Sequence, residues 1–386
     1  MQGNAGLLQG GGRMGTIKCQ TIAGMLDELA PRSLAESWDN VGLLVGDGRK
    51  RVSRVMVCLD VTEWVIEEAV DNNVDMIISH HPMIFGGIKK VNTDTAIGRK
   101  LISLVKNDIS LYCLHTNFDI VSGGLNDIFA KELGFSHWTI IEETYREKLF
   151  KLVVYVPAGH EDSVADAMCR AGAGYIGKYS GCTFRSKGIG TFEPQEGAKP
   201  FLGSIGSLER VEEFRVETIV PEKLLNKAVG EMLKVHPYEE AAYDIYETKN
   251  EGRVMGLGRI AELERETTLS MFAGNVKTLL NAENIRYAGD PNRSIRKVAL
   301  LNGSGSKFIN SARLAGADVL ITGDLQYHGI LEALEMGLCV IDAGHFSTEK
   351  IMMKYITEFL KNKFIELKIE VDVFESSSNT EVLKVL

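Results

Sequence analysis

Short apolar runs alternate with amphipathic segments in the first part of the chain. Arg54–Leu59 predicts a buried strand. Apolar residues at helical spacing then continue to about Asn72, and Asp60 with Glu63 resembles a capping box at the start of this helix. The next expected elements are a strand at Asp75–Ser79, a helix at Ala96–Lys106 and a strand at Ser110–Leu114. This alternation is typical of a parallel or mixed α/β sheet.

The last part of the chain repeats the same order. Val74–Ser79 can be aligned with Ala317–Thr322 without a gap, which favours an internal duplication into two α/β lobes related by a pseudo-twofold axis. Chance similarity between two buried strands is the alternative. The expected elements here are strands at Lys297–Leu301, Asp318–Thr322 and Leu338–Ile341, and helices at Lys307–Leu314 and Tyr327–Glu335.

The middle of the chain has a different order, in which a strand, a helix and a strand occur twice. The expected strands are Lys151–Pro157, Tyr175–Arg185, Glu213–Val220 and Ala241–Glu247, and the expected helices are His160–Ala171 and Pro221–Val235. This order predicts a ferredoxin-like α+β domain inserted between the two lobes. We therefore expect an α/β fold with duplicated lobes around a mixed sheet forming one discontinuous domain. The expected parts are a disordered leader at residues 1–13, a first lobe at 14–146, the insert at 147–249 and a second lobe at 250–386.

Composition narrows the classes of protein that fit. The chain has 386 residues and a net charge of −9, which disfavours non-specific attraction to nucleic acid or to an anionic membrane. No apolar run reaches the roughly 18 residues that a membrane helix needs. The six cysteines are scattered and form no Cys-x-x-Cys pair, which indicates a reducing, cytoplasmic setting.

Candidate chemistry lies at the ends of the expected strands. Five of the eight histidines lie at or shortly after such ends, and three carboxylates lie near them. In open α/β sheets, ligands bind just outside the carboxyl ends of strands, so we expect these side chains to gather in one crevice. They are His80, His81, His115, His328, His345, Asp119, Asp324 and Glu349.

Imidazole and carboxylate groups without a thiolate suit zinc, iron or manganese. Adjacent histidines on an extended segment point in opposite directions, so His80 and His81 could serve different ions if the chain turns at Pro82. His345 and Glu349 would project from one helix face, and the carboxylate could bridge two ions. The alternatives are an incidental His-His pair and a solvated helix face. The agreement of several such features favours a metal site.

A glycine-rich segment, Asn302–Ser306, follows an expected strand and precedes an expected helix. Its backbone N–H groups could bind an anion at the helix N-terminus. The segment is neither a Walker motif nor a complete G-x-G-x-x-G motif, and a tight structural turn explains it equally well.

Five motifs occur in order along the two outer segments. They are Trp38–Leu43, Ser79–Pro82, His115–Asp119, Thr322–Asp324 with His328, and Gly344-His345 with Glu349. Together they resemble the Ngg-interacting-factor-three-like family, whose bacterial members are often labelled GTP cyclohydrolase type-two homologues. The middle segment, with His236–Glu240 followed by Ala241–Glu247, resembles the insert of the longer YqfO-like members, which is similar to PII and CutA proteins.

The resemblance implies two divalent ions per subunit and a toroidal homohexamer with the metal sites facing an internal cavity. It places the metal ligands at His80, His81, Asp119, His345 and Glu349, with Glu349 shared. It also implies that three further residues act near the metals, as supporting or proton-transfer groups. These are His115, Asp324 and His328. Many relatives have Glu where this chain has Asp324, so the reach of that carboxylate differs.

Two ions bring four positive charges, of which Asp119 and Glu349 cancel two. A locally cationic site favours an anionic substrate, and metal-activated water favours hydrolysis. We therefore expect a metal-dependent hydrolase of a nucleotide or another anionic metabolite, of GTP cyclohydrolase type by resemblance. One alternative is a non-catalytic metal-storage, metal-delivery or regulatory oligomer with a ligand-sensing insert. Another, transcription-factor binding, rests on the family name alone. The chain has no recognisable nucleic-acid motif.

Overall fold

The computed structural model describes residues 16–384, so the leader expected at residues 1–13 lies outside the described residues. The chain divides into two compact units. Unit 1 combines Met1–Thr144 with Met255–Leu386, and unit 2 is Tyr145–Val254. None of the helices in the described range is long and apolar enough to cross a membrane.

The first lobe of unit 1 is a five-stranded mixed sheet in the order β17-β4-β5-β6-β2. The three strands β4, β5 and β6 run parallel, and β2 is antiparallel to β6. Its strands are β2 (Gly42–Val45), β4 (Arg54–Cys58), β5 (Met76–Ser79), β6 (Ser110–Cys113) and β17 (Asp372–Glu375). Its main helices are α1 (Cys19–Leu29), α2 (Glu63–Asp71) and α3 (Ala96–Lys106), followed by α4 (Thr116–Ile120) and α5 (Leu125–Glu132).

The second lobe is a six-stranded sheet in the order β13-β16-β15-β14-β12-β7. The strands β14, β15 and β16 run parallel, and β13 is antiparallel to β16, which repeats the order of β4, β5, β6 and β2. Its strands are β7 (Thr139–Arg146), β12 (Val254–Thr268), β13 (Arg286–Ala288), β14 (Ser294–Ser304), β15 (Val319–Gly323) and β16 (Cys339–Asp342). Its helices are α8 (Leu269–Leu279), α9 (Ile309–Leu314) and α10 (Tyr327–Glu335). This shared order supports the proposed duplication.

Two helices near the end of the chain connect the lobes. The short helix α11 (His345–Glu349) packs against β14 and β15, and α12 (Ile351–Glu366) packs against β4 and β17. The chain therefore passes from the second lobe to the first within one helical segment, with a break at Lys350. This path places residues that follow β16 next to residues that follow β5.

The C-terminal segment is held against the first lobe after β17. The carboxylate of Glu68 accepts hydrogen bonds from Ser376, Ser377 and Ser378. Partial burial raises the pKa of Glu68, but these hydrogen bonds outweigh it and lower the pKa to about 2. Next along the chain, Asn379 Oδ1 accepts hydrogen bonds from the backbone N–H groups of residues 59 and 60. The segment is thereby fixed beside the end of β4.

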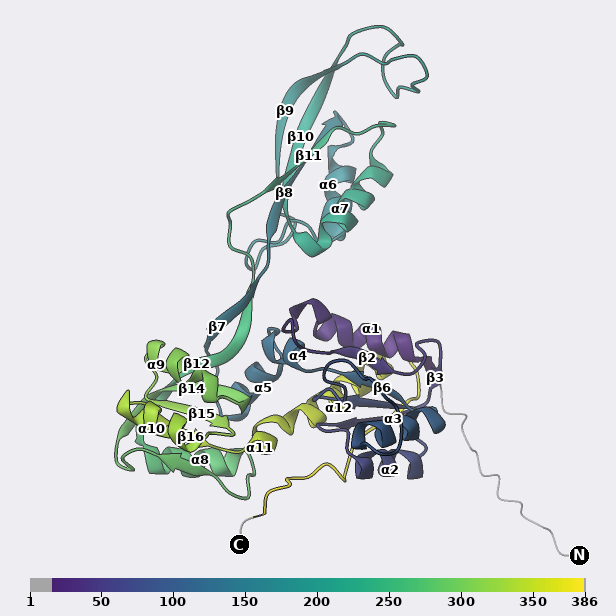
Figure 1. Cartoon of the computed structure of the whole chain (residues 1–386). Helices are drawn as coiled ribbons and strands as arrows, with labels where there is room; N and C mark the ends of the chain where they lie inside the picture. The colour runs from purple at the N-terminus through teal and green to yellow at the C-terminus, as the bar shows by residue number, and fades with distance from the viewer. Residues whose placement is uncertain (1–15, 385–386) are drawn as a thin grey trace, which may run out of the picture. The chain divides into compact units, whose positions relative to one another are not determined.

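Unit 2 is a four-stranded antiparallel sheet in the order β11-β8-β10-β9 with two helices. Figure 1 shows α6 and α7 side by side on one face of this sheet, where they enclose a core of apolar side chains. The elements are β8 (Leu149–Pro157), α6 (Glu161–Arg170), β9 (Thr183–Phe192), β10 (Glu209–Pro221), α7 (Glu222–Val235) and β11 (Tyr243–Glu247). Their order, βαββαβ, is that of a ferredoxin-like unit.

The predicted mixed α/β class is confirmed, and two predicted helices, Ala96–Lys106 and Tyr327–Glu335, have the predicted bounds. The outer lobes have two separate mixed sheets, whereas we expected one. The strand predicted at Tyr175–Arg185 is wrong except for its last three residues, because β9 begins at Thr183. Three glycines before it have positive φ angles and turn the backbone away from an extended path.

The predicted capping box of Asp60 is also wrong. Helix α2 begins at Glu63, and the side chain that caps it is Thr62, whose hydroxyl accepts the N–H of Val65 at 3.2 Å. Thr62 is an ordinary N-cap residue, so the local pattern allowed either assignment. The carboxylate of Asp60 is thereby free to contact a different element.

Candidate metal centre

The first lobe places four candidate residues just beyond the ends of two neighbouring strands. His80 and His81 follow β5, while His115 and Asp119 lie at the start of α4 and within it, directly after β6. The rings of His80 and His81 have centroids 5.1 Å apart, so the chain turns here and brings both rings to one side. The parallel strands β5 and β6 end at the same edge of the sheet, so the residues that follow them lie close together, as the sequence predicted.

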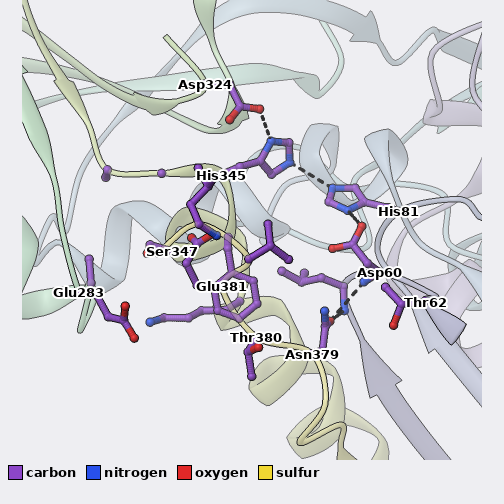
Figure 2. A pocket seen from close by; sticks show the side chains of 18 of the residues that line it. Asp60, Thr62, His81, Glu283, Asp324, His345, Ser347, Asn379, Thr380 and Glu381 are labelled. Atoms are coloured by element: carbon purple, nitrogen blue, oxygen red, sulfur yellow. Dashed lines mark hydrogen bonds and ion pairs between the residues drawn. The ribbon is translucent and has the colours of Figure 1, made fainter. Parts of the chain in front are cut away.

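The second lobe contributes Asp324, which directly follows β15, and two residues of α11. Gly344, with φ of 84°, lets the chain turn sharply into α11, where His345 and Glu349 lie one helical turn apart. Their side chains meet, with His345 Nε2 and Glu349 Oε2 at 3.0 Å. Figure 2 shows His345 between Asp324 and His81, so this face of α11 is directed at the first lobe.

The two lobes meet through these side chains. His81 Nε2 lies 3.2 Å from His345 Nε2 and 3.0 Å from Glu349 Oε2. His80 Nε2 lies 3.7 Å from both Asp119 Oδ1 and Glu349 Oε1. Two groups of potential ligand atoms result, and they share His81. The groups are His80, His81 and His115, and His81, His345 and Glu349.

Each of these histidines has its Nδ1 atom occupied by an oxygen acceptor. The pairs are His80 with Leu114 O at 2.7 Å, His81 with Asp60 at 2.9 Å, His115 with Asp39 at 2.9 Å, and His345 with Asp324 at 2.7 Å. An acceptor on Nδ1 fixes the tautomer and the ring orientation of a histidine that binds a metal through its other nitrogen. In all four rings Nε2 is therefore the nitrogen left to bind an ion.

The carboxylates of this cluster favour the protonated form of two of its histidines. Burial lowers the pKa of His81 and of His345, but hydrogen bonds that the rings donate outweigh it. Those donated to Asp60 and Glu349 raise the pKa of His81 to about 10, and those donated to Glu349 and Asp324 help raise the pKa of His345 to about 9. Burial also raises the pKa of Asp119. A metal ion binding here would displace protons from imidazole rings, because only neutral imidazole is a ligand.

The residues fit divalent ions. His80 is fully buried, and its Nε2 atom has no hydrogen-bond partner among the described residues. Leaving such an atom unpaired costs about 1–3 kcal/mol, so an occupant is expected. Two ligands about 2.1 Å from a tetrahedral ion lie about 3.4 Å apart, and the separations of 3.0–3.7 Å in this cluster are close to that value.

A cavity of about 1440 Å³ opens beside the cluster. Both lobes line it, and so does the C-terminal segment from Asn379 to Lys384. Figure 2 shows Thr62, Asn379 and Thr380 near its wall together with His81. The volume exceeds the roughly 300–1,000 Å³ of ordinary small-molecule sites, so a metabolite the size of a nucleotide has room next to the histidines.

Comparison with known proteins identifies the family of this chain. The profile of the family described as Duf34/NIF3 (NGG1p interacting factor 3) matches residues 17–381. This chain belongs to the Duf34/NIF3 family. Among its relatives, a protein of Halalkalibacterium halodurans is 46% identical over 362 residues, covering 94% of this chain and 97% of the relative. One from Bacillus subtilis is 43% identical over 365 residues, covering 95% and 98%. Both bear the name GTP cyclohydrolase 1 type 2 homolog.

A solved structure supports the fold of this Duf34/NIF3 chain along almost its whole length. The crystal structure of a Bacillus cereus protein related to NIF3 matches with a TM-score of 0.90 and 42% sequence identity. The match covers 96% of this chain and 99% of that chain. The fold of both units therefore has a close experimental counterpart.

Three residues that were not predicted to belong to this Duf34/NIF3 site lie near its centre. Asp39 and Asp60 hold histidines, and Asn302 lies between two carboxylates. Asp60 follows β4 directly, so the strand-end rule used for the histidines would have found it. Asn302 lies near the end of β14 and could have been found in the same way.

His328 lies apart from the cluster in this structure. It is exposed on α10, and it belongs neither to the two groups of potential ligands nor to the cavity lining found within residues 16–384.

Of the two interpretations of the glycine-rich segment Asn302–Ser306, the structure favours the structural turn over the anion site. The N–H of Gly303 already donates to Thr348 Oγ1, and that of Gly305 donates to the carbonyl of Gly323. These donors are not available to an anion.

Proposed function

We propose that unit 1 holds two divalent metal ions, with zinc, iron or manganese as the candidate metals. The proposed ligands are His80, His81, Asp119, His345 and Glu349, with Glu349 shared between the ions. The single observation that supports this most strongly is the buried, unpartnered Nε2 atom of His80, which faces two carboxylate oxygens at 3.7 Å. Ordinary hydrogen bonding does not satisfy this atom, whereas an ion would.

The ligand set supports catalysis by leaving coordination positions open. Two four-coordinate ions need about eight donor positions, and five side chains supply fewer even when Glu349 contacts both ions. Divalent ions bound there would polarise a substrate and lower the pKa of a coordinated water to near neutrality. We therefore propose a metal-dependent hydrolase.

Three further residues have proposed roles around the reacting centre. His115, whose Nδ1 is held by Asp39, can hold or pass a proton at Nε2 or add a further ligand atom beside His80. Asp324 acts through His345, because its carboxylate fixes the ring. His328 is proposed as a proton-transfer group from the family resemblance alone.

The structure changes the charge argument for an anionic substrate. Asp39, Asp60 and Asp324 each bond a histidine of the cluster, in addition to the carboxylates of Asp119 and Glu349. Five carboxylates exceed the four positive charges of two divalent ions, so the centre as a whole is not cationic. An anionic metabolite would therefore be held by direct coordination to the ions. A nucleotide remains the proposed substrate, supported by the cyclohydrolase names of the relatives.

The second candidate is a non-catalytic metal-storage, metal-delivery or regulatory oligomer. The excess of carboxylates favours it, because such a site retains ions without attracting an anion from a distance. In this proposal, unit 2 is a PII/CutA-like module that senses a small molecule, and its βαββαβ order supports that assignment. We also propose a toroidal homohexamer and a cytoplasmic location, the latter supported by six free cysteines.

A substrate screen separates the two candidates. Protein loaded with zinc, manganese or iron is incubated with GTP and with phosphoesters, and products are detected by mass spectrometry. The hydrolase proposal expects turnover that is lost in Glu349→Gln and kept in His137→Ala, since His137 is exposed and outside the cluster. Protein that holds two ions per chain and consumes none of these substrates would favour the non-catalytic oligomer.

A further inference from the structure

Asn302 lies between the two carboxylates of the candidate metal centre. It is buried near the end of β14 in the second lobe. Its amide nitrogen donates to Asp119 Oδ1 at 2.9 Å and to Glu349 Oε1 at 3.2 Å. Asp119 belongs to the first lobe and Glu349 to α11, so one side chain joins carboxylates from two distant parts of the chain.

The chemistry of the amide fits this position. Asn has two N–H bonds on one nitrogen, so it can donate to two acceptors at once while remaining neutral. The opposite orientation would turn Oδ1 toward two carboxylates, which is repulsive, so the nitrogen must face them. An Asp at this position would place a third carboxylate in the group. Asn302 thus keeps two like charges close together without adding another.

The remaining polar atom of this side chain also indicates an occupant. Asn302 Oδ1 is buried and has no hydrogen-bond partner within the described residues. A buried amide oxygen left unpaired is uncommon and costly, and an ion or its bound water would satisfy it. The backbone here is tied separately, since Asn302 N donates to Asn126 Oδ1 at 3.4 Å and Asn126 Nδ2 donates to Asp119 O at 3.1 Å.

We propose that Asn302 is a positioning residue that sets the separation and orientation of the Asp119 and Glu349 carboxylates, and thereby the capacity of the site for two ions. The inference rests on the proposed metal site and adds a residue that acts through its ligands. Loss of a group that orients metal ligands typically costs 10–100-fold in metal affinity. That range is the expected effect of removing the amide.

The test compares Asn302→Leu with Thr218→Val. Leu has a similar size to Asn and no side-chain hydrogen bond. Thr218 of unit 2 is the control because it is also buried, and Val removes its side-chain hydrogen bond to the carbonyl of Cys182, which involves no residue of the cluster. Zn²⁺ alone is titrated into full-length, metal-free protein by calorimetry. Asn302→Leu is expected to bind at least one ion about 10–100-fold more weakly than wild type. Thr218→Val is expected to lose stability while binding two ions with wild-type affinity.

Asn302→Ser provides a second readout that does not require the Leu variant to fold. A serine hydroxyl has one O–H group and can donate to only one of the two carboxylates at a time. The variant should therefore show a smaller rise in Tm on addition of Zn²⁺ than wild type, because weaker binding stabilises the folded protein less. A residue with a purely structural role would lower the metal-free and the Zn²⁺-loaded Tm equally.

Several results would overturn the inference. These are wild-type affinities and stoichiometry in Asn302→Leu, an equal loss of affinity in Thr218→Val, or a Zn²⁺-induced rise in Tm of Asn302→Ser equal to that of wild type. Wild-type protein that takes up no Zn²⁺ would overturn both the inference and the proposed metal site. Wild-type protein that binds two ions but hydrolyses nothing would leave the inference standing, because it concerns ligand positions only.

Discussion

Replacing Gly303 with Ala tests the position of Glu349 without altering any proposed ligand. Gly303 has φ of +65°, a conformation that L-residues other than Gly adopt at a cost. A methyl group at this position would overlap Glu349 Oε1 and lie 3.3 Å from His345 Nε2. Glu349 is buried, so it has little room to move away. The substitution should therefore displace the carboxylate that the two ions are proposed to share.

The magnitude follows from two separate costs. The left-handed backbone costs an alanine about 1–2 kcal/mol, and overpacking of a buried site costs a further ~1–3 kcal/mol. Metal sites tolerate changes in ligand distance of only about 0.2 Å, less than the shift that the overlap requires. Gly303→Ala should therefore lose tight binding of at least one ion as well as about 2–5 kcal/mol of stability.

Gly337→Ala is the matched control. Gly337 lies in the same lobe with φ of +74°, and nothing lies within 4 Å of an added methyl group. It should show the backbone cost of about 1–2 kcal/mol and retain both ions. The assay combines urea unfolding of metal-free protein with metal content after dialysis. If Gly303→Ala retained as much metal as Gly337→Ala, Glu349 would not lie where the structure places it, and the assignment of the shared ligand would be refuted.

Three further predictions concern other contacts. Asp60→Asn and Asp324→Asn should each weaken metal affinity about 10–100-fold, because each carboxylate orients a histidine, and competition with a chromogenic chelator measures this; unchanged affinity would contradict it. Arg259→Met leaves the buried carboxylate of Asp127 without its ion-pair partner and should cost about 3–5 kcal/mol in urea unfolding. The double variant with Asp127→Asn should recover part of that loss, and no recovery would argue against the pair. Because the pKa of Glu68 is lowered, its contribution to stability is complete above the ordinary value of 4.5 and is lost as the pH falls toward about 2. Protection factors for hydrogen exchange in the C-terminal segment, taken relative to the intrinsic exchange rate at each pH, should fall over that range in wild type, and those of Glu68→Gln should already be lower at pH 6.

The elements of the parallel sheets could be predicted from sequence because their signals are local. Helical spacing of apolar residues gave both bounds of α3 and α10, and continuous apolar runs gave β5 and β6 within a residue or two. The prediction that a strand begins at Tyr175 was wrong for a local reason as well. Gly174, Gly177 and Gly181 all have positive φ, which residue hydrophobicity does not encode.

The candidate site was predictable only in part, because its contacts join distant segments. The strand-end rule selected His81 and His345, which the structure places 3.2 Å apart although 264 positions separate them. It did not show that Asp60 contacts His81, because a local capping pattern explained Asp60 equally well. Nor did it show the role of Asn302, whose two acceptors come from different lobes and meet only after both lobes have folded.

The most direct test of the central claim is the number of metal ions bound per chain. Full-length protein is made metal-free, loaded with Zn²⁺ or Mn²⁺, dialysed and analysed by native mass spectrometry. We predict two ions per chain in wild type, and one or none in Glu349→Gln, because Glu349 contacts histidines from both groups of ligand atoms. Wild-type protein that retains no ion, or a Glu349→Gln variant that retains two, would contradict the account.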